Sequence, residues 1–177
     1  EEIYEAFAAC EASLERLVKT YRTGHAIAEG IPTVICGRPN VGKSAFYNHL
    51  VGRDAAIVTS IAGTTRDVLT DTVTIGRVTL RLSDTAGLRE TSDVVESIGI
   101  ERSMREIENA ELVLAVFDGS RAPTDEDIAL ASRIAESGKT ALALINKNDI
   151  AGNAHAEFEK LCKDFSSVIH VSASTGD

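Results

Sequence analysis

The first stretch whose residue types could do chemistry is segment 37–44, which reads GRPNVGKS and fits the pattern GxxxxGK[ST]. Backbone N–H groups of such a loop surround an anion, and the N-terminus of a following helix adds positive potential. We predict that Lys43 contacts the β- and γ-phosphates of a nucleotide and that the Ser44 hydroxyl binds Mg²⁺. The predicted phosphate-binding residues are Asn40, Val41, Gly42, Lys43, Ser44 and Ala45.

A second motif, Asp84-Thr85-Ala86-Gly87, follows an apolar run at 78–82. An Asp at the carboxyl end of a strand beside a phosphate loop can hold Mg²⁺ through water. Gly87 lets a backbone N–H approach the γ-phosphate. Alone, DTAG is consistent with an ordinary turn; downstream of the 37–44 motif, it indicates a nucleotide site.

The third motif, Asn146-Lys147-Asn148-Asp149, follows the apolar run 141–145. The Asp149 carboxylate can accept hydrogen bonds from N1–H and the 2-amino group of guanine, whereas adenine would leave it unpaired. The segment Ser172, Ala173 and Ser174 can support the base by backbone contacts. Three such loops, each at the end of an expected strand, predict a GTP site.

The elements that must position these loops alternate in type from Ile31 onwards, which predicts a mostly parallel α/β sheet. Gly76-Arg77 joins two alternating runs and predicts one antiparallel edge hairpin with a tight turn. The expected strands span 33–36, 68–75, 78–82, 112–117, 141–145 and 168–171, and the expected helices span 43–51, 96–109, 126–137 and 155–165.

The N-terminal segment has its own pattern, in which apolar residues spaced 4, 3, 4, 3, 4 form a helical seam that ends before Gly24 and Gly30. Either this seam packs on the domain that follows, or it belongs to a helical bundle whose other helices are not in the sequence. We favour the bundle, since the rest looks complete without the seam. The expected organisation is a helical segment at 1–29, the remnant of a helical domain, and a GTP-binding domain at 30–177 whose C-terminal end is truncated. The seam consists of Ile3, Phe7, Cys10, Leu14, Leu17 and Tyr21.

Composition and charge narrow the possible functions. The 177 residues are 44% hydrophobic and 25% charged, which is typical of one globular domain, and the longest apolar run, 112–117, is too short to span a bilayer. The 18 Lys and Arg residues against 27 Asp and Glu give a net charge of −9, which disfavours a nucleic-acid-binding surface on this domain as a whole.

Cysteine and histidine usage points to a reducing, cytoplasmic location without a zinc site. The three cysteines, Cys10, Cys36 and Cys162, have no CxxC spacing, and each thiol is expected to be a small buried apolar group. The four histidines are scattered along the chain and are interpreted as structural or exposed: His25, His49, His155 and His170.

These motifs resemble those of the P-loop GTPases of the translation-factor class, over residues 31–177. Segment 63–67, GTTRD, is similar to switch I of the TrmE–Era–Der group, and segment 95–102, VESIGIER, is particularly similar to the MnmE family of tRNA-modification GTPases. In that family the G domain is inserted in a helical domain, which matches the N-terminal seam. The family's folate-binding domain and C-terminal cysteine motif are not in this sequence, so the tRNA assignment rests on resemblance.

The resemblance also implies roles for single residues. Leu88 stands where many Ras relatives carry a catalytic Gln, and the family pattern assigns the positioning of water to Glu96 through a second water; the alternative is a surface residue in the first turn of a helix. Thr65 matches the switch I ligand of Mg²⁺, with Thr64 as close competitor. The implied catalytic residues are Glu96, Lys43 and Thr65, the Mg²⁺ ligands are Ser44, Thr65 and Asp84, and the K⁺ ligands are Asn40, Thr59, Ile61 and Thr64.

The expectation from the resemblance is a Ras-like G domain that hydrolyses GTP to GDP with Mg²⁺ and K⁺, and that is activated when two G domains dimerise through their switch regions. Its implied partners are the FAD-dependent MnmG (GidA) subunit and tRNA, the latter bound by the full-length complex and not by this domain, with no membrane contact. The alternative is an assembly switch of the Era or Der type that binds ribosomal RNA. Arg38, Arg66 and Arg89 are candidates for an arginine finger in cis.

Overall fold

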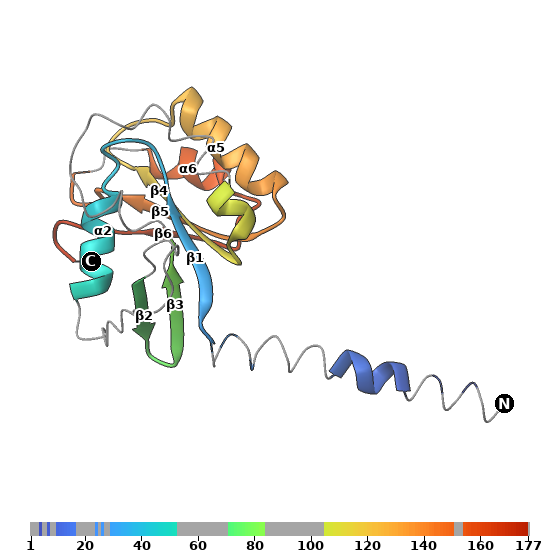
Figure 1. Ribbon diagram of the computed structural model, residues 1–177. Helices are drawn as coiled ribbons and strands as arrows, with labels where there is room; N and C mark the ends of the chain where they lie inside the picture. The colour runs from blue at the N-terminus through green and yellow to red at the C-terminus, as the bar shows by residue number, and fades with distance from the viewer. Residues whose placement is uncertain are drawn as a thin grey trace.

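A six-stranded sheet with the strand order β2-β3-β1-β4-β5-β6 organises the chain (Figure 1). The computed structural model describes residues 4, 7, 10–16, 24, 26, 29–52, 71–83, 105–150 and 154–176. The strands are β1 (Ile31–Cys36), β2 (Asp71–Ile75), β3 (Val78–Leu82), β4 (Leu112–Asp118), β5 (Thr140–Asn146) and β6 (Ser167–His170). The helices are α2 (Lys43–Gly52), α5 (Asp125–Glu136) and α6 (His155–Leu161), with helical residues also at 105–109.

The sheet is parallel except at one edge. Strand β1 pairs in parallel with β3 and β4, and β5 pairs in parallel with β4 and β6. Strand β2 runs antiparallel to β3, with Ile75 opposite Val78, so two residues form the turn. Gly76 starts this turn at φ +64°, a conformation that favours glycine. The predicted fold class, a mostly parallel α/β sheet with one antiparallel edge hairpin, is confirmed.

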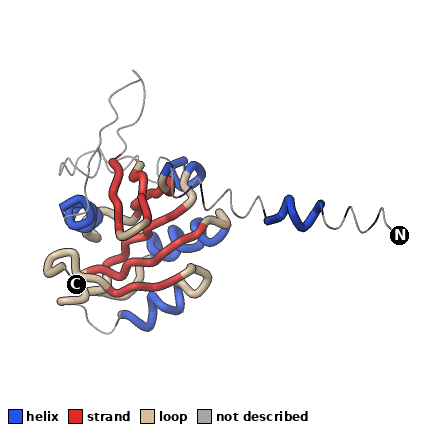
Figure 2. The backbone as a smooth tube through the Cα atoms, turned by 90° about the horizontal axis from the view of Figure 1, so that it is seen from below, coloured by secondary structure: helices blue, strands red, loops and turns tan. Residues whose placement is uncertain are grey.

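Helices cover both faces of the sheet (Figure 2). On one face, α5, α6 and residues 105–109 pack around Phe117 and Phe158, whose ring centroids are 5.5 Å apart. On the other face, α2 packs through Tyr47 on β1, β3 and β4. Alternate residues of β4 enter the two clusters, so the strand is buried on both sides, as its apolar run predicted.

The last helix is shorter than its periodicity indicated. The sequence predicted a helix over 155–165, but α6 ends at Leu161. The N–H of Phe165 bonds the carbonyl of Cys162, a tight turn, and the N–H of Ser166 bonds the carbonyl of Ala141 at 2.8 Å. Pairing with the edge of β5 therefore ends the helix before its apolar pattern does. Within the described ranges, no helix is both long and apolar enough to cross a bilayer.

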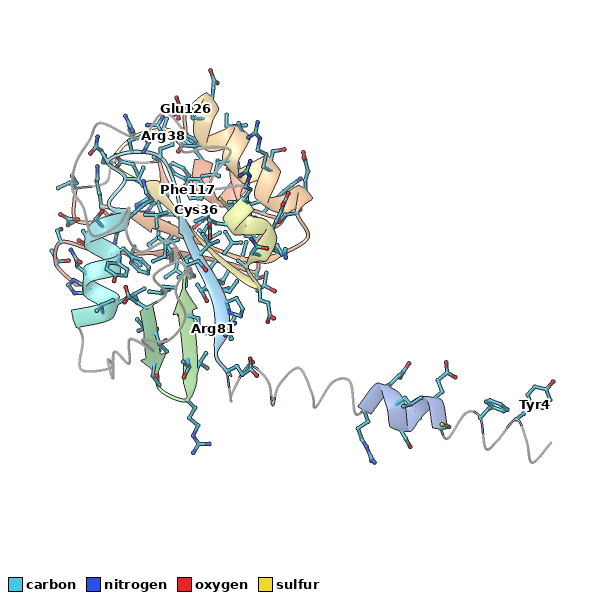
Figure 3. All side chains as sticks on the ribbon, in the orientation of Figure 1. Tyr4, Cys36, Arg38, Arg81, Phe117 and Glu126 are labelled. Carbon is cyan, nitrogen blue, oxygen red and sulfur yellow. The ribbon has the colours of Figure 1, made fainter. Side chains whose placement is uncertain are left out.

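The N-terminal segment is helical at each described residue up to Glu29, and Gly24, which was expected to interrupt the helix, is itself helical. Helical residues 10–16 lie away from the sheet in Figure 1, and Figure 3 places Tyr4 still further along this segment. The side chains of Phe7 and Leu14 are 72% and 57% exposed, so these seam residues do not pack on the sheet. The predicted division into 1–29 and 30–177 stays a proposal.

The three thiols lie in different environments. Cys36 and Cys162 are buried, as expected, but the expectation was wrong for Cys10, which is exposed on the N-terminal helix. Burial raises the pKa of Cys36 to about 12, although the Lys43 ammonium opposes this. Burial, reinforced by the Asp127 carboxylate, likewise raises the pKa of Cys162 to about 12. Only a thiolate is a good nucleophile, so these two groups are unreactive at neutral pH.

Thiol labelling of the native chain should therefore modify one cysteine rapidly. We expect a disulfide reagent at pH 8 to label Cys10 within the dead time of ordinary mixing and to reach Cys36 and Cys162 only as slowly as the fold opens. The measurement is the labelled fraction against time, with the unfolded chain as control, in which all three thiols should react together. Rapid native labelling of two or three thiols would contradict the buried positions.

Candidate nucleotide-binding site

The predicted phosphate loop and the two predicted base loops meet at one edge of the sheet. They follow β1, β5 and β6, which run in parallel, so their carboxyl ends open on the same side. The described site residues there are Asn40, Val41, Gly42, Lys43, Ser44, Ala45, Asn146, Lys147, Asp149, Ser172, Ala173 and Ser174. The remaining predicted site residues lie outside the described residues and stay predictions: Thr59, Ile61, Thr64, Thr65, Asp84, Gly87 and Glu96.

The phosphate loop needs its two glycines because other groups come very close to them. A Cβ on Gly42 would lie 2.1 Å from Nδ2 of Asn146, and one on Gly37 would lie 2.3 Å from the carbonyl oxygen of Val116. Asn40 is exposed in the left-handed region at φ 60°, where Asn is better tolerated than most residues. This backbone places the loop directly before the N-terminus of α2, where helix amides favour an anion.

Lys43 and Ser44 begin α2. The Lys43 ammonium donates a hydrogen bond to the carbonyl oxygen of Arg38 at 2.7 Å, so it lies back across its own loop. Ser44 is half-buried in the first turn of the helix, and a hydroxyl oxygen there is a ligand that Mg²⁺ accepts beside phosphate oxygens. Of the three predicted Mg²⁺ ligands, the structure describes Ser44, and its hydroxyl fits the ion.

Asn146 connects the three loops. Its side chain, in a residue only 3% exposed, donates from Nδ2 to the carbonyl oxygen of Val41 at 2.8 Å and accepts from the N–H of Ala173 at 2.9 Å. The amide nitrogen thus bonds an acceptor in the phosphate loop, and the amide oxygen bonds a donor in the last base loop. Each of these contacts satisfies a polar group that would be costly to leave unpaired.

Asp149 is held by the serines that follow β6. The hydroxyl of Ser172 donates to one carboxylate oxygen at 2.7 Å, and that of Ser174 donates to the other at 3.2 Å. Chiefly through the Ser172 hydrogen bond, the pKa of Asp149 lies below its usual value. The carboxylate is exposed and ionised at neutral pH, and its oxygens have further lone pairs to accept from a guanine edge.

Asp118 is a site residue that the sequence reasoning missed. It ends β4 directly opposite Asn146 of β5, and its carboxylate accepts from the Lys147 ammonium at 2.8 Å. Burial by itself would raise the pKa of Asp118, but hydrogen bonds from Lys147 and Ser120 outweigh it and leave the pKa below its usual value. The available signal was its position, an Asp at the carboxyl end of a buried strand.

The Arg38 guanidinium is bound by other side chains and is not available as an arginine finger in this structure. Its guanidinium contacts Thr124 and Asp127 at the start of α5, and Figure 3 shows Arg38 next to Glu126 at that end of the helix. The other two candidates, Arg66 and Arg89, lie outside the described residues.

Two of the histidines meet, which their sequence separation did not predict. The rings of His155 and His170 lie 4.3 Å apart between centroids, because α6 begins beside β6. Their contact is consistent with the structural role expected for them.

A glycine-rich phosphate loop, an Asn-Lys-x-Asp loop and a serine loop on a sheet of this order define a P-loop GTP-binding domain. The chain belongs to the family described as 50S ribosome-binding GTPase, whose model matches residues 33–147. It is also a homologue of MnmE: it is 51% identical over 138 residues to the tRNA modification GTPase MnmE of Ligilactobacillus salivarius (strain UCC118) and 46% identical over 155 residues to that of Streptococcus pyogenes serotype M5 (strain Manfredo). These matches cover 78% and 88% of this chain but only 29% and 33% of the relatives, so the chain spans about a third of their length.

Solved structures share the fold at much lower identity. The bacterial selenocysteine-specific elongation factor EF-Sec has a TM-score of 0.58 at 18% identity, over 82% of this chain and 26% of that one. The G domain of the T. maritima FeoB iron transporter has a TM-score of 0.50 at 23% identity, over 82% of this chain and 89% of that one. The chain is thus a GTPase with an α/β P-loop fold and a homologue of MnmE.

Proposed function

We propose that this chain is the catalytic G domain of a tRNA wobble-uridine modification GTPase. The observation that carries the proposal is the identity of 51% to a tRNA modification GTPase, MnmE, over most of this chain. The partners proposed with it are the FAD-dependent MnmG subunit and tRNA, the latter held by the full-length complex because a domain of net charge −9 repels a polyanion. The proposed location is the cytoplasm.

The described site residues have separate roles in nucleotide binding. Lys43 exchanges the Arg38 carbonyl for phosphate oxygens, Asp149 accepts from the guanine edge, and Asn146 keeps the loops together. In the proposed mechanism Glu96 orients the attacking water, since Leu88 cannot. Ser44, with Thr65 and Asp84, would hold Mg²⁺, which would neutralise charge on the phosphates.

We further propose that the site would hold K⁺, which would supply the positive charge that an arginine finger supplies in other GTPases. The proposed ligands are the Asn40 side chain and oxygens of Thr59, Ile61 and Thr64. Two observations support this: Asn40 is exposed at the rim of the phosphate loop, and Arg38 is occupied elsewhere. The resemblance adds that two G domains meet through their switch regions and order this cage.

The test is steady-state GTP turnover in matched KCl and NaCl across a protein dilution series. We expect turnover per chain to rise with K⁺, to respond weakly to the smaller Na⁺, and to fall on dilution because the active species is a dimer. Equal rates in both salts at every dilution would reject the K⁺-dependent dimer, and Arg66 and Arg89 would become the residues to substitute.

Two variants of Asn40 separate the ligand from the backbone. Asn40→Ala removes the carboxamide but also strains a left-handed position, whereas Asn40→Gly removes it without strain. Both should lose the K⁺ response, and Asn40→Gly should bind GDP nearly as the parent chain does. A K⁺ response retained in Asn40→Gly would remove Asn40 from the ion site.

A second candidate function is supported by the family description, which names a 50S ribosome-binding GTPase. In that case the chain would act as an assembly switch of the Era or Der type, with RNA contacts made by other domains. Co-sedimentation with 50S subunits, compared with binding to MnmG, separates the two functions. Nucleotide-dependent binding to the subunit and none to MnmG would favour the second.

A further inference from the structure

Among the described residues, hydrogen bonds attach the phosphate loop to the rest of the domain at Val41 and at Arg38. At one, Asn146 bonds the Val41 carbonyl, as described above. At the other, the Arg38 side chain, only 17% exposed, reaches the N-terminus of α5. Arg38 stands at a variable position of the GxxxxGK[ST] motif, and its three partners, Thr124, Glu126 and Asp127, belong to none of the GTP-site motifs. Thr124 lies 86 residues further along the chain.

Two of the partners of Arg38, Thr124 and Asp127, form a capping box. The Thr124 hydroxyl caps α5 by accepting from the N–H of Asp127, and the Asp127 carboxylate accepts from the N–H and the hydroxyl of Thr124 at 2.9 and 2.7 Å. Arg38 donates from one terminal nitrogen to the Thr124 hydroxyl at 2.5 Å. That hydroxyl therefore donates once and accepts twice, which is its full capacity.

Charge pairing completes the attachment. Nε of Arg38 lies 3.5 Å from Oδ1 of Asp127, whose side chain is 4% exposed, and neither atom has a hydrogen-bond partner among the described residues. The two charges therefore stabilise each other, because both side chains are largely shielded from water. Glu126 also lies 3.5 Å from the guanidinium, but its side chain is 67% exposed and water screens that contact.

The attachment of Arg38 affects the phosphate-binding site through the carbonyl oxygen of the same residue. The carbonyl oxygen of Arg38 is the acceptor of the Lys43 ammonium, so the residue that the side chain anchors also holds the phosphate-binding lysine. We propose that Arg38 is a positioning residue: it fastens the phosphate loop to the capped start of α5 and so holds Lys43 where it can exchange the Arg38 carbonyl for the β- and γ-phosphates. The proposal deepens the GTP site and rests on its role in nucleotide binding.

The test measures GDP affinity by competition with a fluorescent GDP analogue, together with the melting temperature of the nucleotide-free protein. Arg38→Ala should raise the Kd for GDP about 10-fold, because the phosphate loop would lose its attachment and the charged contact of Lys43 with the phosphates would be displaced. Arg38→Lys should recover part of the loss, since an ammonium can still meet Asp127. Asp127→Asn keeps an acceptor for the Thr124 N–H and should raise the Kd several-fold through the lost charge.

The double variant Arg38→Ala/Asp127→Asn should be no worse than Arg38→Ala alone, because both substitutions break one contact. The matched control is Arg77→Ala, which removes an exposed arginine from the hairpin turn. A purely structural ion pair would lower the melting temperature and leave the Kd for GDP within twofold, and that result would overturn the proposal. Losses of GDP affinity that multiply in the double variant would also overturn it. An unmodified chain that fails to bind GDP would overturn the GTP site itself.

Discussion

Substitution of Glu96 by Ala should lower kcat for GTP hydrolysis about 10²- to 10³-fold and leave the Kd for GDP near that of the parent chain. Hydrolysis needs a water molecule aligned with the γ-phosphate, and Leu88, directly after DTAG, has no polar group to hold it. A carboxylate that orients water acts in the transition state and not in the ground state, so its loss appears in kcat. The measurement is turnover at saturating GTP beside a GDP titration.

Two comparisons make this result specific. Glu96→Gln keeps a hydrogen-bonding group without the charge, and an intermediate rate would show that orientation carries part of the effect. The control is Glu108→Ala, which removes an exposed glutamate at residues 105–109, the described end of the same predicted helix, and should leave kcat unchanged. A rate in Glu96→Ala equal to that of Glu108→Ala would make Glu96 a surface residue favoured by the helix dipole.

Substitution of Asp149 by Asn should weaken GDP binding about 100-fold or more and shift the preference from guanine towards xanthine nucleotides. The carboxylate accepts from two guanine donors, and an amide NH₂ in its place faces donors instead. Xanthine carries an oxygen at the position of the 2-amino group and restores a partner. The local geometry should survive, because an amide oxygen can still accept from Ser172 and an amide nitrogen can donate to Ser174.

The titration of Asp149 gives an independent check on its role. Its pKa is held below the ordinary value of 3.8, so protonation, which would remove the acceptor, begins only at strongly acidic pH. The affinity of the unmodified chain for GDP should therefore stay flat as the pH falls from 8 to about 5.5. Asp164→Asn, at an exposed aspartate after α6, is the matched control and should bind GDP normally. A similar loss in both variants, or equal GDP affinity in Asp149→Asn, would exclude Asp149 from the base site.

Local sequence determined most of the elements and the types of the loop residues. Period-two alternation around Gly76 determined the edge hairpin, since a two-residue turn with a positive φ needs glycine. The apolar run of β4 determined a strand buried on both faces. The GxxxxGK[ST] pattern determined a loop of tight backbone turns before a helix, because few other residues can adopt its conformations. These features depend on neighbours in the chain, and a single sequence contains that information.

Only the tertiary structure decided which distant residues meet. Val41 and Asn146 are 105 residues apart and join because β1, β4 and β5 are adjacent in the sheet. The same strand order places Asp118 beside Lys147, whereas helix α5 offers its capped N-terminus to Arg38. The residues next to Arg38 in the sequence do not show whether its guanidinium acts as an arginine finger or holds the phosphate loop in place. That difference comes from the acidic partner that the fold places within reach, because a charge shielded from water is held by the nearest opposite charge.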